Sequence, residues 1–475
     1  MTENHDAIVT DPKLEETDGR PVAHGRAPHP TQGGEGRHHQ GDEMNVTTSG
    51  TTAEVLASPF TVNKLQIKNR IVLGPMAVLR PTEDGRPSEQ TIAFLTRRAE
   101  GGVGLIIVGG SVASERAWNE SPFFPNLRFD KEEFVADLAR LVDAVHVAGS
   151  PIFAQLFPSF GRMGVPRNGA WISAASPKSV DFGSGGLPDH LYVPGGRVTP
   201  LPHEATVEEI KGLERDVVMS ARRAKAAGFD GVEIAAHMCY FYSSFLSPLA
   251  NKRTDEYGGS AENRARALRD AVAAVRAEVG PDFPVGIRMS VNDHMPDGQD
   301  TDGFAEVAGH IVKAGVDFIS LTEGNYESMR DNIPSASGNM LAHGEPQEFR
   351  AAVGDGVRLF LSSTPDPQQA GEAIAAGHAD ATMLARQILA DPDYALKVVE
   401  GRTSEIVWCD HANSCLRRLV LNIPVACHKN PEMGREDPGA KVSTPGQNFV
   451  VWAAGNSFLM KTADAVARVL PKKKH

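Results

Sequence analysis

RIVLGPM, at residues 70–76, opens the segment that decides the fold: it is an apolar run of strand length bounded by turns. Seven similar runs follow it: VGLIIVGG (103–110), PIFAQLF (151–157), DGVEIAA (230–236), PVGIRMS (284–290), VDFISLT (316–322), VRLFLSS (357–363) and DATMLAR (380–386). Longer segments with helical apolar spacing, such as KEEFVADLARLVDAVHVAG (131–149), separate the runs. Strands that are apolar on both faces and alternate with helices predict a parallel sheet that is covered on both sides.

Eight strand–helix units of this kind predict an α/β fold, a (β/α)8 TIM barrel. A doubly wound sheet is the alternative, but the count of eight and the lack of a strand–GxGxxG–helix unit at the start favour the barrel. We place the barrel at residues 55–405. It follows a tail at residues 1–54 and precedes a C-terminal extension at residues 406–475.

The tail, at residues 1–54, is rich in Gly, Pro, His and charged residues and poor in large apolar ones, so we predict that it is disordered. A metal-binding role for it stays open, because it contains several histidines: His5, His24, His29, His38 and His39. In the extension, NFVVWAAGNSFLMKTADAVARVL (448–470) suggests a strand, a turn and a helix. It lacks GxGxxG, so we predict no FAD domain there.

The overall composition argues against nucleic-acid-binding, membrane-spanning and disulfide-dense proteins. The 475 residues are 41% hydrophobic and 23% charged, as in ordinary soluble globular proteins, and the net charge is −12. An acidic chain of this kind predicts no nucleic-acid partner, and the lack of an apolar run of about 20 residues predicts no membrane span. Four cysteines exclude a disulfide-dense scaffold. The N-terminus has no apolar core typical of a secretory signal, so we expect a cytoplasmic protein, and formation of a homo-oligomer stays open.

Polar side chains stand near the carboxyl ends of the predicted strands, where barrel enzymes carry their chemistry. Gln155 and Arg288 interrupt apolar runs, and a buried amide or guanidinium costs free energy unless it has a partner. Together these residues indicate a polar ligand at the barrel mouth. The loops after the seventh and eighth strands are a recurrent phosphate site, and here they contain four candidate residues: Ser362, Ser363, Ala385 and Arg386.

Several motifs resemble those of the old yellow enzyme family of FMN-dependent oxidoreductases. They are NRIVLGPM (69–76), FAQLF (153–157), GFDGVEI (228–234), VGIRMS (285–290), ARQILADPD (385–393) and, most specifically, FLSPLANKRTDEYGGSAENR (245–264). The resemblance implies a barrel that holds FMN at its mouth. By motif, Pro75, Met76 and Ala77 would lie along the flavin. Gln155 and Arg288 would contact its pyrimidine side, and the serines with Ala385 and Arg386 would hold the phosphate.

The family carries a pattern like E-I-H-x-A-H/N-G-Y after the fourth strand, which clamps a substrate carbonyl and supplies a proton. Here the text is EIAAHMCY (233–240), so Tyr240 falls on the proton-donating position. His237 falls one place short of the second clamp position, and Ala235 replaces the first histidine. We predict Tyr240 as the proton donor and His237 as a ligand of the carbonyl oxygen. A histidine that only supports its neighbours is the alternative for His237.

The segment after the third strand, at about residues 158–200, is too long and too rich in Gly, Pro and Ser to be a simple connection. Long loops in compact domains are usually binding loops or lids, so we expect a lid over the barrel mouth.

The cysteines of the extension indicate a degenerate cluster site. One branch of the family, which includes 2,4-dienoyl-CoA reductase and trimethylamine dehydrogenase, carries C-x2-C-N-x-C-(x11 or x12)-C, which holds a [4Fe-4S] cluster. Here Cys409, Cys415 and Cys427 match that pattern, and Ala412 replaces the fourth ligand. We therefore predict no [4Fe-4S] cluster. A metal held by the three cysteines, with His411 as a substitute ligand for iron or zinc, is the alternative.

Taken together, the resemblance implies NAD(P)H-driven reduction of an activated C=C bond in an enone or enoyl thioester, with FMN as the cofactor. Two alternatives stay open. One is an amine or C–H dehydrogenase of the same flavin barrel that passes electrons to an external carrier. The other is a non-enzymatic barrel that binds a ligand, because several family residues are replaced.

Overall fold

The computed structural model describes residues 52–167, 169–182, 198–329, 339–439 and 445–454, together with Asn456 and Leu459. The predicted disordered tail lies outside this range except for its last three residues, where helix α1 (Thr52–Ala57) begins. The chain divides into two compact units, and every described residue belongs to the second, Gly50–His475.

Eight parallel strands close into a barrel, and each lies in one of the eight predicted apolar runs. In barrel order they are β3 (Ile71–Leu73), β4 (Leu105–Val108), β7 (Ile152–Leu156), β10 (Gly231–Ala236), β11 (Val285–Ser290), β12 (Phe318–Thr322), β13 (Arg358–Ser362) and β14 (Ala381–Leu384). Strand β14 pairs with β3 and closes the ring. The prediction of a (β/α)8 barrel is confirmed.

Aromatic rings fill the part of the barrel interior nearer the amino ends of the strands. The ring centroids of Phe153 and Phe318 are 5.3 Å apart, and those of Phe318 and Phe360 are 5.0 Å apart. A Cβ atom at Gly231 or Gly286 would lie within 3 Å of one of these rings, so glycine at both positions makes room for this layer. Because inward residues alternate along a strand, the next inward positions are polar and form the floor of the site described below.

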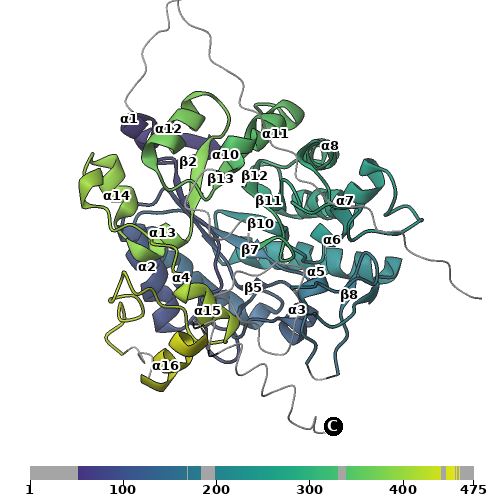
Figure 1. The fold of residues 1–475 in the computed structure, drawn as a ribbon, viewed down its shortest axis with the longest axis horizontal. Coiled ribbons are helices and arrows are strands. Elements are labelled where there is room, and N and C mark those ends of the chain that lie inside the picture. The colour runs from purple at the N-terminus through teal and green to yellow at the C-terminus, as the bar shows by residue number, and fades with distance from the viewer. Residues whose placement is uncertain are drawn as a thin grey trace, which may run out of the picture. The chain divides into compact units, whose positions relative to one another are not determined.

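The principal helices surround the strands (Figure 1). They are α2 (Glu89–Glu100), α4 (Val135–Val147), α5 (Val207–Ala226), α7 (Ala261–Val279), α8 (Thr301–Ile311), α11 (Glu345–Val353) and α12 (Pro367–Ala375). Polar residues cap several of them. At α5, Thr206 and Glu209 form a reciprocal capping box, which satisfies backbone N–H groups at the helix start.

Short strands and helices lie outside the eight barrel strands. The short strands are β1 (Phe60–Val62), β2 (Leu65–Ile67), β5 (Ser111–Val112), β6 (Leu127–Arg128), β8 (Ser173–Ala174) and β9 (His203–Glu204). The short helices are α3 (Glu115–Glu120), α6 (Ser243–Leu246), α10 (Asn339–His343), α13 (Arg386–Ala390) and α14 (Tyr394–Val399). Phe60, Val62 and Ile67 of the β1–β2 hairpin join the apolar cluster of the barrel interior.

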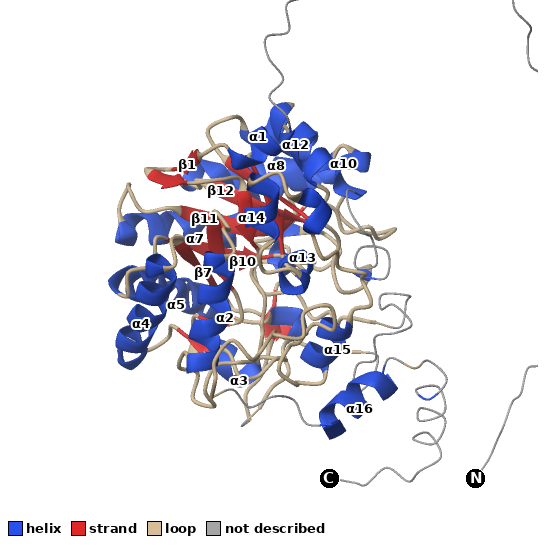
Figure 2. Ribbon diagram, turned by 90° about the vertical axis from the view of Figure 1, so that its left-hand side faces the viewer, coloured by secondary structure: helices blue, strands red, loops and turns tan. Residues whose placement is uncertain are grey.

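The C-terminal extension contains helices α15 (Ser414–Val420) and α16 (Pro445–Ala454), which lie together on one side of the barrel (Figure 2). The expectation of a strand at the start of residues 448–470 is wrong, because this segment continues α16. A short apolar run does not distinguish a strand from a helix. Val451 and Ala454, three residues apart on one helical face, are buried, and this burial favours the helix.

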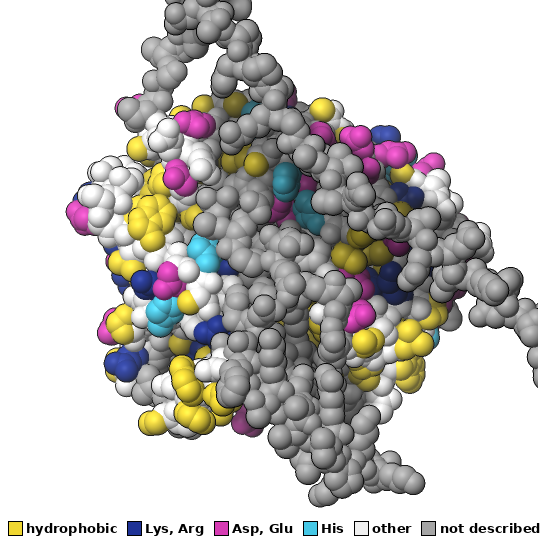
Figure 3. Space-filling view, viewed as in Figure 1, with side chains coloured by type: hydrophobic (Ala, Val, Ile, Leu, Met, Phe, Trp, Pro, Cys, Tyr) yellow, Lys and Arg dark blue, Asp and Glu magenta, His cyan; other side chains and the backbone are white. Residues whose placement is uncertain are grey.

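Two observations bear on partners. Around the face seen in Figure 3, the described Lys and Arg side chains are interspersed with Asp and Glu instead of forming one basic patch. Among the helices within the described ranges, none combines the length and apolar content needed to cross a bilayer.

Candidate active site

The second layer of the barrel interior is a buried polar group that rests on the aromatic layer. Gln155 on β7 pairs with Glu233 on β10, and Arg288 on β11 pairs with Ser320 on β12. The Gln155 Nε2 atom donates a 2.6 Å hydrogen bond to one carboxylate oxygen of Glu233, and the Ser320 hydroxyl donates to the other. Glu233, which is fully buried, therefore fixes the orientation of the Gln155 amide.

Arg288 brings a positive charge to this floor. Burial lowers the pKa of its guanidinium, and the nearby carboxylate of Glu233 opposes that shift. Burial raises the pKa of Glu233, and Arg288 opposes that shift in turn. An arginine stays protonated in proteins, so the floor carries a fixed cation. Its Nε atom is buried and has no hydrogen-bond partner among the described residues. Because Arg288 lines both cavities described below, this donor is available to a bound ligand.

Above the floor is a cavity of about 270 Å³. The predicted residues that line it are Pro75, Met76, Ala77, Gln155, His237, Tyr240, Arg288, Ser363 and Arg386. A smaller cavity of about 70 Å³ adjoins it and shares Arg288, Ser363 and Arg386. Ser362 and Ala385 line the smaller cavity. Every residue predicted for catalysis or cofactor binding thus lies on one of two neighbouring cavities.

The smaller cavity has the features expected of an anion subsite. The Ser362 hydroxyl is buried and has no hydrogen-bond partner among the described residues. The backbone of Ser363 has φ 60°, a left-handed conformation that favours glycine. The Arg386 side chain on the same wall donates a 2.9 Å hydrogen bond to Asn413, which holds it in place.

His237 and Tyr240 lie on one short turn directly after β10. The Tyr240 backbone N–H donates to the His237 carbonyl at 3.2 Å, and the centroids of the two rings are 5.2 Å apart. Phe157 and Phe160 meet the Tyr240 ring edge to face, at 4.9 and 5.6 Å between centroids. The turn and the two aromatic rings therefore hold the Tyr240 side chain at the cavity wall.

Burial sets the protonation of both side chains. It raises the pKa of Tyr240 to about 12, so this phenol keeps its proton at neutral pH. For His237, burial first and the positive charge of Arg288 second hold the pKa well below its usual value, so the imidazole is neutral. The His237 Nδ1 atom is buried without a partner among the described residues. The wall thus presents a protonated phenol and a neutral imidazole.

Tyr326 is a site residue that the sequence reasoning missed. Its hydroxyl lies 2.7 Å from the Tyr240 hydroxyl, and both side chains line the larger cavity. It follows β12 in TEGNYESM (322–329), at the end of a strand for which the motifs indicate no site residue. The position of this tyrosine just beyond a predicted barrel strand was the available signal.

The structure describes only part of the predicted lid, because Asn168 and residues 183–197 lie outside the described ranges. Within the described parts, Phe160 lines the cavity and Phe182 contacts the Tyr326 ring at 6.2 Å between centroids. Arg162 forms a buried 2.8 Å ion pair with Glu327. The start of this loop is therefore tied to the segment that carries Tyr326.

The three cysteines of the extension lie near the smaller cavity, which Cys409 and His411 line. Burial raises the pKa of Cys415 to about 11, and Cys427 and Cys409 are near enough to oppose its ionisation further. In the described part of the chain, the group of metal-ligating atoms close enough to share one ion lies elsewhere and includes none of these cysteines. Metal binding by Cys409, Cys415 and Cys427 stays a prediction for metal analysis.

Comparison with known proteins identifies the family of this chain. The model of the NADH:flavin oxidoreductase / NADH oxidase family matches residues 55–405, the range predicted for the barrel. The chain belongs to this family. The resemblance to old yellow enzymes seen in the sequence motifs is therefore confirmed.

Individual relatives are similar to this chain over most of its length. The metal reductase of Desulforamulus reducens is 36% identical over 414 residues, which is 85% of this chain and 58% of the relative. The cinnamate reductase of Clostridium sporogenes is 32% identical over 401 residues, 81% of this chain and 58% of the relative. A structure of 2-naphthoyl-CoA reductase with 2-naphthoyl-CoA has a TM-score of 0.71 at 26% identity, over 81% of this chain and 58% of that one. The chain thus spans less than two thirds of these relatives.

Proposed function

We propose that this chain is an FMN-dependent oxidoreductase in which NAD(P)H drives the reduction of an activated C=C bond in an enone or enoyl thioester. One observation carries the proposal: a protonated phenol, Tyr240, and a fixed cation, Arg288, line the same cavity. Reduction of such a bond requires stabilisation of negative charge on the electron donor and a proton for the substrate, and these two groups match those needs.

The residues present fit FMN. Two buried donors lack partners among the described residues, the Arg288 Nε atom and the Ser362 hydroxyl, and they lie at the two cavities where a ring and a phosphate would bind. Gln155, which Glu233 orients, adds an amide to the floor. The residues that would hold FMN are Pro75, Met76, Ala77, Gln155, Arg288, Ser362, Ser363, Ala385 and Arg386. FMN, when bound, supplies the two-electron chemistry between NAD(P)H and the C=C bond.

The chain's own residues bind and protonate the substrate. The neutral His237 would donate a hydrogen bond to the carbonyl oxygen and orient the C=C bond. Tyr240 would donate its proton to the α carbon, and Tyr326, at 2.7 Å, would stabilise the phenolate that this transfer leaves. Phe157 and Phe160 cover the Tyr240 ring and exclude water from it. The names of the cinnamate and 2-naphthoyl-CoA reductases support an unsaturated acid or thioester as the substrate class.

The first experiment is an anaerobic spectrum of the purified full chain reconstituted with FMN. We expect NADH or NADPH to bleach the flavin absorption, and an enone or a cinnamoyl thioester to restore it. Trimethylamine and dimethylglycine serve as rival reductants. Bleaching by an amine alone would favour the dehydrogenase alternative, and failure to bind FMN would favour a ligand-binding barrel.

A glycine behind the predicted flavin segment provides a structural test. A Cβ atom at Gly109 would lie 2.5 Å from the Met76 backbone nitrogen, so the 75–77 segment would have to move. Overpacking of this kind costs about 1–3 kcal/mol, so we expect Gly109→Ala to weaken FMN binding by about 5- to 150-fold. A fluorescence titration with FMN measures the change. Gly356→Ala, where a Cβ atom meets nothing within 4 Å, is the matched control. Equal FMN affinity in both variants would contradict the placement of residues 75–77 along the flavin.

A further inference from the structure

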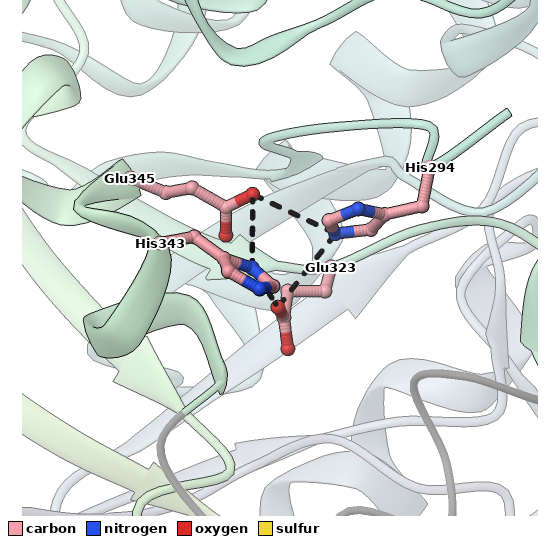
Figure 4. A group of neighbouring side chains, drawn as sticks. All are labelled: His294, Glu323, His343 and Glu345. Carbon is pink, nitrogen blue, oxygen red and sulfur yellow. Dashed lines mark ion pairs between the residues drawn. The ribbon is translucent and has the colours of Figure 1, made fainter. Parts of the chain in front are cut away.

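A second polar cluster lies beside the proposed active site. We propose that it binds one divalent transition-metal ion, preferentially Zn²⁺, through four side chains: His294, Glu323, His343 and Glu345. This inference goes beyond the proposed redox function and does not depend on it. Figure 4 shows the two imidazoles and the two carboxylates converging on one point from separate segments.

The distances in this cluster, the four-residue metal site, suit a single ion. The His294 Nε2 atom is 3.7 Å from one oxygen of Glu323 and 3.6 Å from one oxygen of Glu345. The His343 Nδ1 atom is 3.7 and 4.0 Å from the same two oxygens. With zinc–ligand bonds of about 2.0–2.2 Å, tetrahedral ligand atoms lie roughly 3.3–3.6 Å apart. These four distances lie at or just above the tetrahedral spacing, and all four ligand atoms lie within 4.8 Å of one another, so the side chains would close in around a bound ion.

The buried carboxylates point to a missing cation. The Glu345 side chain is only 1% exposed, and neither of its oxygens has a hydrogen-bond partner among the described residues. The Glu323 side chain is 8% exposed, and the oxygen that faces the histidines also lacks a partner there. The facing imidazole nitrogens are within ion-pair distance, at 3.6–4.0 Å, but beyond hydrogen-bond distance. Buried carboxylates are normally hydrogen-bonded, paired or bound to a metal, and an ion held by all four side chains would satisfy these oxygens more completely than the long imidazole contacts do.

Electrostatics agree with this geometry. Two carboxylates that face each other in a buried place oppose each other's ionisation, and a divalent cation between them removes that opposition.

The fold brings the four ligands together at the carboxyl ends of two neighbouring strands. Glu323 directly follows β12, and His294 lies in the loop after β11. His343 ends α10 and Glu345 begins α11, with Gly344 between them at φ 81°. That left-handed turn, which glycine adopts without strain, lets the two side chains face the same point.

The ligand types select the metal class. Two imidazole nitrogens with two carboxylate oxygens suit zinc and similar transition metals, whereas calcium and magnesium prefer oxygen ligands alone. The His343 side chain is 53% exposed, so an ion can reach the site from solvent. A bound ion would connect three segments, including the one that carries Tyr326, because Glu323 also lines the larger cavity. The metal would therefore brace the cavity wall.

Equilibrium dialysis tests the site without any need for turnover. The full chain is stripped with a chelator, dialysed against ZnCl2, and its bound zinc counted by mass spectrometry. The other histidines and cysteines bind zinc to the same extent in every variant, so the measurement is the difference from wild type. We expect His294→Ala and Glu345→Gln each to bind about one equivalent less zinc. His310→Ala, a histidine on α8 outside the cluster, is the matched control and should bind as much as wild type.

A second variant guards against misfolding. His343 is half exposed, so His343→Ala should keep the fold, as judged by circular dichroism, and should still lose about one equivalent. We also expect zinc to raise the melting temperature of the wild type by more than that of His343→Ala. Equal zinc binding and an equal thermal shift in the wild type and His343→Ala would overturn the proposal. Failure of FMN binding or turnover would leave this result unaffected.

Discussion

Replacement of Tyr240 by phenylalanine is expected to slow reduction of the C=C substrate by about 10²- to 10⁴-fold, the usual contribution of a positioned proton donor. Reduction of the bound FMN by NAD(P)H should be unchanged, because that step does not need this proton. The reason is structural: Tyr240 is a protonated phenol at the cavity wall, with a pKa raised to about 12 by burial, and Tyr326 is its hydroxyl partner. Stopped-flow spectroscopy of the two half-reactions, measured separately, checks this result.

A neighbouring tyrosine supplies the matched control for this experiment. Tyr242 is buried two residues away, and its hydroxyl has no hydrogen-bond partner among the described residues. It does not line the cavity, so Tyr242→Phe should leave both half-reactions near wild-type rates. Tyr326→Phe should give an intermediate loss, because it keeps the donor and removes only its partner. If Tyr240→Phe behaves like Tyr242→Phe, another group supplies the proton.

Replacement of Arg288 by methionine is expected to weaken FMN binding by about 10- to 150-fold, since a hydrogen bond from a charged group contributes about 1.5–3 kcal/mol. The rate of flavin reduction should also fall by about 10²- to 10³-fold, because a fixed cation no longer stabilises the developing negative charge. Arg288 is suited to both roles because its Nε atom is buried and lacks a partner among the described residues. Fluorescence titration with FMN and anaerobic stopped-flow reduction measure the two effects.

The Arg288 variant needs a companion, because it removes the cation next to a buried carboxylate. Glu233 would then be fully buried without a counter-charge, and this alone can destabilise the fold. The double variant Arg288→Met/Glu233→Gln removes both charges and keeps an amide whose oxygen can accept from Gln155 and whose NH2 group can donate to the Ser320 hydroxyl oxygen. We expect it to fold and still to show both losses. Arg222→Met on α5, whose side chain is 60% exposed, is the control. Wild-type FMN affinity and reduction rate in the folded double variant would exclude Arg288 from the flavin site.

The barrel could be predicted because its evidence is local. Each strand is a short run that is apolar on both faces, such as VGLIIVGG at 103–110, and each run is followed by a segment with helical spacing. The secondary structure of the extension could not be predicted in this way, because its apolar run has no clear period. Residues 448–454 are apolar without a clear period, so the strand expected there proved to be the end of α16.

The candidate site was predictable only where a motif carried it. The proline, glutamine and arginine positions of the flavin cavities matched a family pattern, and the structure brings them to two adjoining cavities. Tyr326 belongs to none of the motifs, and Glu233, although it begins EIAAHMCY (233–240), has no role that the motif predicts. Their importance comes from contacts with Tyr240 and Gln155, which are 86 and 78 residues away in the chain.

The amino-acid sequence by itself determined the eight strands, the helices between them and the family. The reason is that strand-length apolar runs, helical spacing and motifs are each properties of a short stretch of residues. Only the tertiary structure decided which side chains meet. Barrel closure sets the register that places Arg288 across from Ala235 and Ser320. It also brings His294, Glu323, His343 and Glu345 to one point from segments that share no motif. Such convergence depends on strand register and loop path, and these follow from packing of the whole barrel.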